Sequence, residues 1–229
     1  MCEALHDISL AYNVPMTSGK DSMKNDFRAN GVRISVPPTV LYSAVAHIED
    51  VRKTTTTEFK CVGDLVYVVG LTHDELGGSE FYRLFGVLGA NVPRVRPAEA
   101  AARYRRMARA NTAGLLASCH DLSDGGLAVA LAESVIGGTV GVSIDLPADD
   151  EPGDGKEGLR RSLFSESHSR FLVSVPPESV QAFELLMGDD AQRIGEVMAH
   201  ETLTVRRSDR AVIDLPASKL VQAWRGKLE

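Results

Sequence analysis

The sequence predicts an α+β fold in which helices cover a mixed β-sheet. A run of buried-type strand residues, Leu65 to Val69, lies between loop signals, and a mostly apolar helical pattern follows the glycine pair Gly125–Gly126. Further strand and helix patterns then follow one another irregularly down to residues 217–228. Strands and helices in this order favour a sandwich of helices on a mixed sheet.

The composition narrows the class of protein. Of the 229 residues, 44% are hydrophobic and 24% are charged, which is typical of a globular chain. The formal net charge of −6 argues against a nucleic-acid partner, because general nucleic-acid binders carry a basic surface. No apolar run approaches membrane-spanning length and no signal peptide is recognisable, so we expect a cytoplasmic protein with no membrane partner.

The three cysteines, Cys2, Cys61 and Cys119, form no C-x-x-C pair, so neither a disulfide framework nor a zinc site is expected. Cys119 precedes His120, and a nucleophile with its base is one interpretation. Catalytic pairs meet in space, however, and adjacency in sequence alone does not support this interpretation. The chain also lacks a G-x-C-x-G elbow of the kind that a glutamine-hydrolysing cysteine would use.

Residues 1–57 are predicted to form a separate part of the chain. Residues 2–12 place apolar side chains at helical spacing, and residues 32–36 and 40–47 have strand patterns. A polar stretch that begins at Thr54 is a suitable connection between two domains. We therefore place a domain boundary between residues 57 and 58.

A short segment after the first helix suits a phosphorylated ligand and its metal. Gly19, Lys20, Asp21 and Ser22 combine a flexible glycine, a cation, a carboxylate and a hydroxyl in four residues. The segment is not a Walker A loop, because that motif would need glycine in place of Val14 and a hydroxyl residue in place of Asp21. A solvated turn remains the alternative.

The part of the chain after residue 57 contains most of the predicted elements. Ser79 is expected to cap a helix that carries Phe81, Leu84, Phe85 and Leu88. Pro97 opens a long helix through Asn111, and we expect its four arginines, Arg103, Arg105, Arg106 and Arg109, on a solvated face. The other predicted elements are strands at 139–146, 171–175, 193–197 and 202–206, helices at 178–187 and 217–228, and an acidic loop at 147–158.

The turn at residues 118–127 is the main candidate site. Ser123 or Asp124 is expected to cap the following helix, and Gly125 and Gly126 would let backbone N–H groups approach a phosphate at the helix N-terminus. Asp121 and Asp124 would repel a bare phosphate, so this interpretation requires a cation, and Mg²⁺ prefers such oxygen ligands. The alternative is a tight glycine turn with a capped helix and no ligand.

Residues 165–170 form a second polar segment, located just before the strand at 171–175. Its Arg170 could contact a phosphate, and its His168 could transfer a proton. A loop tip with ordinary polar residues would explain the same composition.

Four motifs together resemble one family. They are residues 15–23, residues 75–79 (Glu-Leu-Gly-Gly-Ser), residues 120–127 (His-Asp-Leu-Ser-Asp-Gly-Gly-Leu) and residues 164–167 (Phe-Ser-Glu-Ser). In this order and spacing they resemble the second half of the synthetase region of phosphoribosylformylglycinamidine synthase, within the AIR synthase-related superfamily. The resemblance implies that residues 1–57 are the C-terminal part of a β-rich AIR synthase-like N-terminal domain, here truncated. Residues 58–229 would then be an AIR synthase-related C-terminal domain of α/β sandwich type.

The resemblance also implies an activity and its partners. The family converts formylglycinamide ribonucleotide, ATP and glutamine-derived ammonia into formylglycinamidine ribonucleotide. The implied cofactors are Mg²⁺ and ATP or ADP, and the implied partners are the remaining synthetase half and a glutaminase domain or subunit. We expect no turnover by this chain alone.

The site residues implied by the resemblance fall in two groups. Gly19, Lys20, Asp21 and Ser22 match the segment near the catalytic ATP and substrate. Asp121 matches a metal ligand, and Ser123, with Gly125 and Gly126, matches a nucleotide contact that is auxiliary in long family members. Two alternatives stay open: another ATP-dependent enzyme of the superfamily, or a non-catalytic Mg-nucleotide-binding or assembly module.

Overall fold

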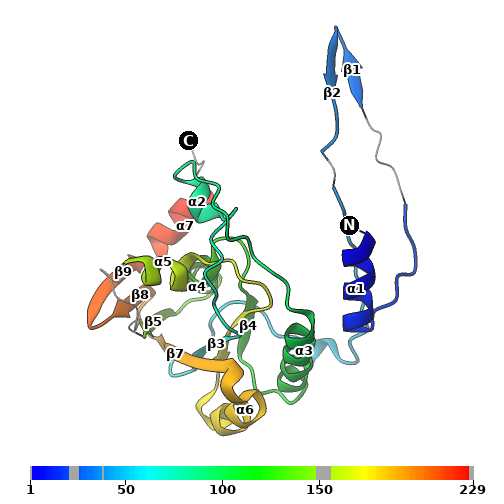
Figure 1. Cartoon of the computed structure of the whole chain (residues 1–229). Coiled ribbons are helices and arrows are strands. Elements are labelled where there is room, and N and C mark those ends of the chain that lie inside the picture. Colours follow the sequence, from blue (N-terminus) through cyan, green and yellow to red (C-terminus); the bar gives the residue numbers. More distant parts are fainter. Residues whose placement is uncertain (1, 21–25, 38, 148–155, 227–229) are drawn as a thin grey trace. The chain divides into compact units, whose positions relative to one another are not determined.

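The computed structural model describes residues 2–20, 26–37, 39–147 and 156–226. The chain divides into two compact units, Met1–Val51 and Arg52–Glu229, which are described separately below (Figure 1). This division lies six residues before the predicted domain boundary. The assignment of residues 1–57 to a truncated AIR synthase-like domain stays a prediction.

The first unit contains a helix and a hairpin. Helix α1, Cys2–Tyr12, confirms the predicted helix, and strands β1, Phe27–Ala29, and β2, Val32–Ile34, pair antiparallel. Asn30 and Gly31 both have positive φ, as the two central residues of a tight hairpin turn require. The strand predicted at 40–47 is wrong, because those residues form no strand and no described strand of this unit pairs with them.

The second unit is built on a mixed seven-stranded sheet with the order β4-β6-β3-β7-β5-β8-β9. Only β5 and β8 pair in parallel, and the other neighbours are antiparallel. The strands are β3 Leu65–Val69, β4 Ser118–Asp121, β5 Gly141–Leu146, β6 Phe171–Val175, β7 Ala191–Met198, β8 Thr202–Arg207 and β9 Arg210–Pro216. The predicted α+β fold with a mixed sheet is therefore confirmed. Strands β4 and β9 are additions to the predicted strands, and β4 occupies the first four residues of the turn predicted at 118–127.

Helices cover both faces of this sheet (Figure 1). Val66 and Val68 of β3 pack with α4, α5 and α7 in one core, whereas Tyr67 and Val69 pack with α3 and α6 in the other, as strand alternation requires. The helices are α2 Glu80–Arg83, α3 Pro97–Thr112, α4 Gly126–Ile136, α5 Lys156–Phe164, α6 Val180–Met187 and α7 Ala217–Arg225. Short 3₁₀ turns lie at Val51–Lys53, Pro177–Ser179 and Gly188–Asp190.

Two helix predictions need correction. Ser79 caps α2 as expected, since its hydroxyl accepts the Tyr82 N–H at 3.2 Å, but the helix ends at Arg83 instead of continuing to Leu88. Gly86 has φ of +65°, which a right-handed helix does not contain, so the helix cannot continue through it. The acidic loop predicted at 147–158 is wrong at its end, where residues from Lys156 belong to α5, while residues 148–155 lie outside the described residues.

The solvated arginine face predicted on α3 is also partly wrong. Arg103 is buried, with 6% of its surface exposed. Its guanidinium forms an ion pair with the Asp190 carboxylate, with 2.9 Å between Nη2 and Oδ1, and this pair compensates the buried charge. Arg106 binds the other oxygen of the same carboxylate. Arg105 and Arg109 are exposed as expected.

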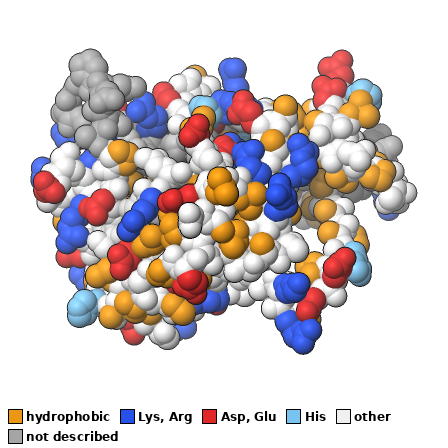
Figure 2. Space-filling model, turned by 90° about the horizontal axis from the view of Figure 1, so that it is seen from below, with side chains coloured by type: hydrophobic (Ala, Val, Ile, Leu, Met, Phe, Trp, Pro, Cys, Tyr) orange, Lys and Arg blue, Asp and Glu red, His pale blue; other side chains and the backbone are white. Residues whose placement is uncertain are grey.

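The surface of the described residues carries charges of both signs. In Figure 2, basic and acidic side chains are interspersed with apolar ones. None of the helices in the described ranges combines the length and the apolar character needed to cross a lipid bilayer.

Candidate functional site

Strand β4 leads into the glycine turn that the sequence singles out. The cap predicted for α4 is wrong, because the helix begins after Gly125, which has φ of +77° and provides no side-chain cap. The Ser123 hydroxyl donates instead to the carboxylate of Asp121. The Gly126 N–H donates to the Ser123 carbonyl at 3.0 Å, so the turn closes on its own backbone.

The Glu166 carboxylate accepts a hydrogen bond from the backbone N–H of Gly125, which the sequence predicts to face a phosphate. Its Oε1 accepts the Gly125 N–H at 2.8 Å and also the Glu80 N–H, at the start of α2, at 2.9 Å. One carboxylate thus joins the starts of two helices that are distant in sequence. Sequence patterns assign Glu166 no role, because they contain no signal for a contact 41 residues away.

The two glycines are also required by close packing. A Cβ on Gly125 would lie 2.2 Å from Val129 Cγ2, and a Cβ on Gly126 would lie 2.5 Å from the Ser165 carbonyl oxygen. Both residues have positive φ, which disfavours other side chains. The tight-turn alternative therefore explains both glycines without a ligand.

Three of the four motifs meet at this turn. The Ser165 hydroxyl donates to the His73 carbonyl at 2.7 Å and accepts the Glu75 N–H at 3.3 Å, while the Glu166 N–H donates to the Glu75 carbonyl at 3.2 Å. Residues 164–167 are thereby bonded to the Glu75–Ser79 motif on one side and to the glycine turn on the other. The structure brings these predicted segments together in the second unit.

The fourth motif belongs to the first unit. Gly19 and Lys20 are exposed and lie in neither a helix nor a strand. Asp21 and Ser22 lie outside the described residues.

Arg170 holds the 165–170 loop instead of facing a ligand. It is 1% exposed, and its guanidinium donates to the Ser167 carbonyl at 2.9 Å, the Ser165 carbonyl at 2.5 Å and Thr72 Oγ1 at 2.9 Å. Burial lowers the pKa of Arg170 to about 10, although the charges of Glu75 and Glu166 oppose the shift. The side chain stays protonated at neutral pH, and its donors serve the loop.

Asp121 is the candidate metal ligand at the end of β4. Its side chain is 67% exposed, and one of its oxygens lies 3.5 Å from His120 Nδ1. His120 Nε2 lies 3.0 Å from Glu133 Oε2 on α4, which fixes the imidazole against the helix. No three His, Cys, Asp or Glu side chains gather as a metal site within the described residues. An exposed carboxylate fits Mg²⁺ as a single protein ligand, because Mg²⁺ commonly takes its other ligands from water and phosphate.

Cys119 does not form a nucleophilic pair with His120. Burial, together with the charge of Asp121, raises the pKa of the Cys119 thiol to about 11. The thiol therefore stays protonated at neutral pH, whereas nucleophilic cysteines need the thiolate. Both nitrogens of the His120 ring lie within hydrogen-bond distance of other groups, the Asp121 carbonyl and Glu133.

The fold and the convergent motifs define an α+β domain of the AIR synthase type. Residues 62–208 match the family described as "AIR synthase related protein, C-terminal domain". The match spans more than half of the chain, so the chain belongs to this family. The predicted membership of the AIR synthase-related superfamily is confirmed.

Solved structures of low sequence identity share the fold. Thermotoga maritima PurL complexed with FGAR superposes with a TM-score of 0.63 at 16% identity, covering 74% of this chain and 30% of that chain. Phosphoribosylformylglycinamidine synthase II from T. maritima gives a TM-score of 0.58 at 16% identity, with 74% and 28% covered. T. maritima PurL complexed with ATP gives 0.56 at 18% identity, with 74% and 27% covered. The chain thus spans less than a third of these relatives.

Proposed function

We propose that this chain forms the C-terminal synthetase portion of a phosphoribosylformylglycinamidine synthase. The family match over residues 62–208 carries this proposal, and the meeting of three family-like motifs at the glycine turn supports it. Related folds have been solved with FGAR and with ATP, which supports a substrate of that class and an ATP-dependent reaction.

The proposed reaction explains why ATP is needed. An amide oxygen is a poor leaving group, so transfer of the γ-phosphoryl group of ATP to that oxygen gives an iminophosphate and ADP. Ammonia then attacks the amide carbon, and inorganic phosphate leaves with the former amide oxygen. Such phosphoryl transfer depends on positioning and on neutralisation of phosphate charge.

The proposal includes partners for this chain. The ammonia derives from glutamine, and the sequence contains no cysteine elbow for glutamine hydrolysis. A glutaminase domain or subunit would supply the ammonia, and the remaining synthetase half would complete the catalytic site. We assign Gly19, Lys20, Asp21 and Ser22 to the vicinity of ATP and substrate by resemblance.

We assign Asp121 to Mg²⁺ and Ser123, Gly125 and Gly126 to the phosphates of an auxiliary nucleotide. When bound, Mg²⁺ would neutralise phosphate charge beside the carboxylate. Ser123 orients Asp121 through its hydrogen bond. Because the Gly125 N–H already donates to Glu166, a phosphate oxygen would have to replace that carboxylate to reach the donor.

Replacing Asp121 tests this assignment. We expect Asp121→Asn to weaken the binding of Mg-ADP to the 229-residue chain about tenfold or more, because an inner carboxylate ligand is lost. Isothermal titration calorimetry measures the affinity, and EDTA should remove binding to the unmodified chain. Asp145→Asn, which changes an exposed carboxylate on β5, is the matched control. Equal affinities of the two variants would reject Asp121 as the metal ligand.

A further inference from the structure

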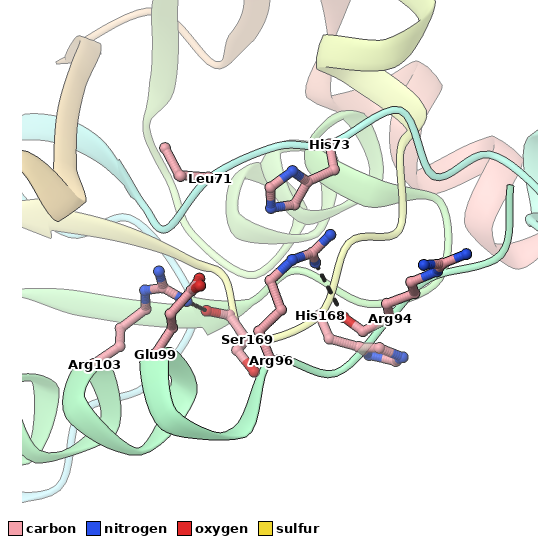
Figure 3. Close-up of a pocket in the computed structure, with 8 residues that line it drawn as sticks. All are labelled: Leu71, His73, Arg94, Arg96, Glu99, Arg103, His168 and Ser169. Atoms are coloured by element: carbon pink, nitrogen blue, oxygen red, sulfur yellow. Dashed lines mark hydrogen bonds between the residues drawn. The ribbon is translucent and has the colours of Figure 1, made fainter.

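A group of basic residues lies apart from Asp121 and the glycine turn, the proposed nucleotide site. It surrounds a small, solvent-open hollow of about 10 Å³ between the loop after β3, the start of α3 and the loop before β6 (Figure 3). Arginine and histidine side chains dominate its lining, which comprises Leu71, His73, Arg94, Arg96, Glu99, Arg103, His168 and Ser169. We call this hollow the basic pocket.

The wall of the basic pocket contains a buried donor without an acceptor. Arg103 donates to the Ser169 carbonyl at 3.0 Å and pairs with Asp190, but its Nε has no hydrogen-bond partner among the described residues. A Cβ on Gly70 would lie 3.0 Å from this nitrogen, so only glycine leaves the arginine room. An unpaired buried N–H is costly, and this one belongs to a residue that lines the basic pocket.

The mouth of the basic pocket offers further donors. Arg96 pairs with Glu75 at 2.9 Å. It also donates to the Arg94 carbonyl, as Figure 3 shows. Within the described part of the chain, the Arg94 guanidinium and the rings of His73 and His168 make no hydrogen bond of their own. Glu99 is the one acid among the lining residues, and it is exposed.

The basic residues of the pocket differ in whether a carboxylate already neutralises them. Two of the lining arginines already have a carboxylate partner, since Glu75 pairs with Arg96 and Asp190 pairs with Arg103. Burial raises the pKa of Glu75, but the Ser167 hydroxyl and the charge of Arg96 outweigh burial and bring it below its ordinary value. Glu75 therefore keeps its charge at neutral pH. Arg94 and His168 are left to bind a ligand, with Glu99 opposing it.

We propose that the basic pocket binds the phosphate group of a small phosphate monoester. Guanidinium groups match the oxygens of phosphate in geometry and charge, and imidazole N–H groups add donors. Leu71 is the only large apolar side chain of the lining, so the pocket suits a charged head group and leaves the rest of the ligand in solvent. This second anion site is independent of the proposed function at Asp121.

The proposal is tested by removing a positive charge in one variant, Arg94→Gln, and a negative charge in another, Glu99→Gln, both at the mouth of the basic pocket. Binding of ribose 5-phosphate and of inorganic phosphate to the 229-residue chain is measured by isothermal titration calorimetry without Mg²⁺, at constant ionic strength. We expect Arg94→Gln to weaken ribose 5-phosphate binding about tenfold and Glu99→Gln to strengthen it. Both side chains are exposed, and circular dichroism checks that the variants fold.

Two controls separate this site from a general charge effect and from the proposed nucleotide site. Arg105→Gln removes an exposed arginine of α3 outside the pocket, and we expect unchanged binding. Asp121→Asn should also leave ribose 5-phosphate binding unchanged, whatever it does to Mg-ADP. Because only the phosphate group enters the pocket, we expect the ester and inorganic phosphate to bind with similar affinity. The proposal is overturned if no saturable binding of either is found, or if Arg94→Gln and Arg105→Gln have equal effects.

Discussion

At the scale of single residues, Asp190 shows how a carboxylate fixes the basic side of α3. It lies in the 3₁₀ turn before β7 and binds both Arg103 and Arg106. Burial raises the pKa of Asp190, yet the hydrogen bonds and charges of the two arginines together bring the pKa below its ordinary value. The charged form of Asp190 is therefore the one that the fold stabilises.

This pKa shift gives the stability a pH dependence. A depressed pKa in the folded state adds stability above the unfolded-state pKa of about 3.9, and that stability is lost as the pH falls through the lower folded-state value. We expect Asp190→Asn to reduce the free energy of unfolding at pH 7 by about 3 kcal/mol, since it leaves a buried arginine uncompensated. The difference from the unmodified chain should shrink below about pH 4.

Urea unfolding between pH 7 and pH 3 measures both effects. Asp209→Asn, in the exposed turn before β9, is the control, and its free energy of unfolding should stay close to that of the unmodified chain at every pH. A constant difference between Asp190→Asn and the unmodified chain at all pH values would contradict the ion-pair explanation.

At the scale of elements, the glycine turn depends on contact between α4 and the loop after α5. We expect Gly126→Ala to lower the free energy of unfolding by about 3 kcal/mol, because its Cβ would clash with the Ser165 carbonyl in addition to the cost of positive φ. Gly114 has a similar φ of +69° and open space around it, so Gly114→Ala isolates the backbone cost at about 1 kcal/mol. Denaturant unfolding compares the two, and equal losses would show that the packing at Gly126 is unimportant.

The elements that sequence predicts correctly are those with local signals. Pro97 marks the start of α3 and Ser79 caps α2, because both effects act within one helical turn. The cap of α4 and the length of α2 were mispredicted. In the first case the Ser123 hydroxyl donates to Asp121 and the helix begins only after Gly125, whose N–H donates to Glu166, 41 residues away. In the second case Gly86 has a left-handed conformation that the helix cannot contain.

The candidate site shows the same limit. The four motifs could be recognised from residue types and spacing, but the roles of Arg170, Glu166 and Arg103 depend on partners far along the chain. Arg170 and Arg103 are buried and Glu166 is half-buried, and the packing of other elements decides this in each case. Sequence patterns alone favour exposure for such residues.

At the scale of the whole molecule, the hydrophobic core belongs to one unit. Every buried apolar side chain among the described residues lies between Phe59 and Leu220, and no described residue of the first unit is buried. The family match at residues 62–208 falls within the same unit. The second unit therefore has the features of an independent folding domain.

We accordingly expect residues 52–229 to fold without the first 51 residues. Their removal deletes no buried apolar side chain of the described core, so the thermal unfolding midpoint should stay within about 3 °C of that of the full chain, a shift equivalent to roughly 1 kcal/mol for this size. Circular dichroism melts of the two chains provide the comparison. A non-cooperative melt, or a midpoint lower by about 10 °C or more, would show that the first unit contributes to the stability of the second.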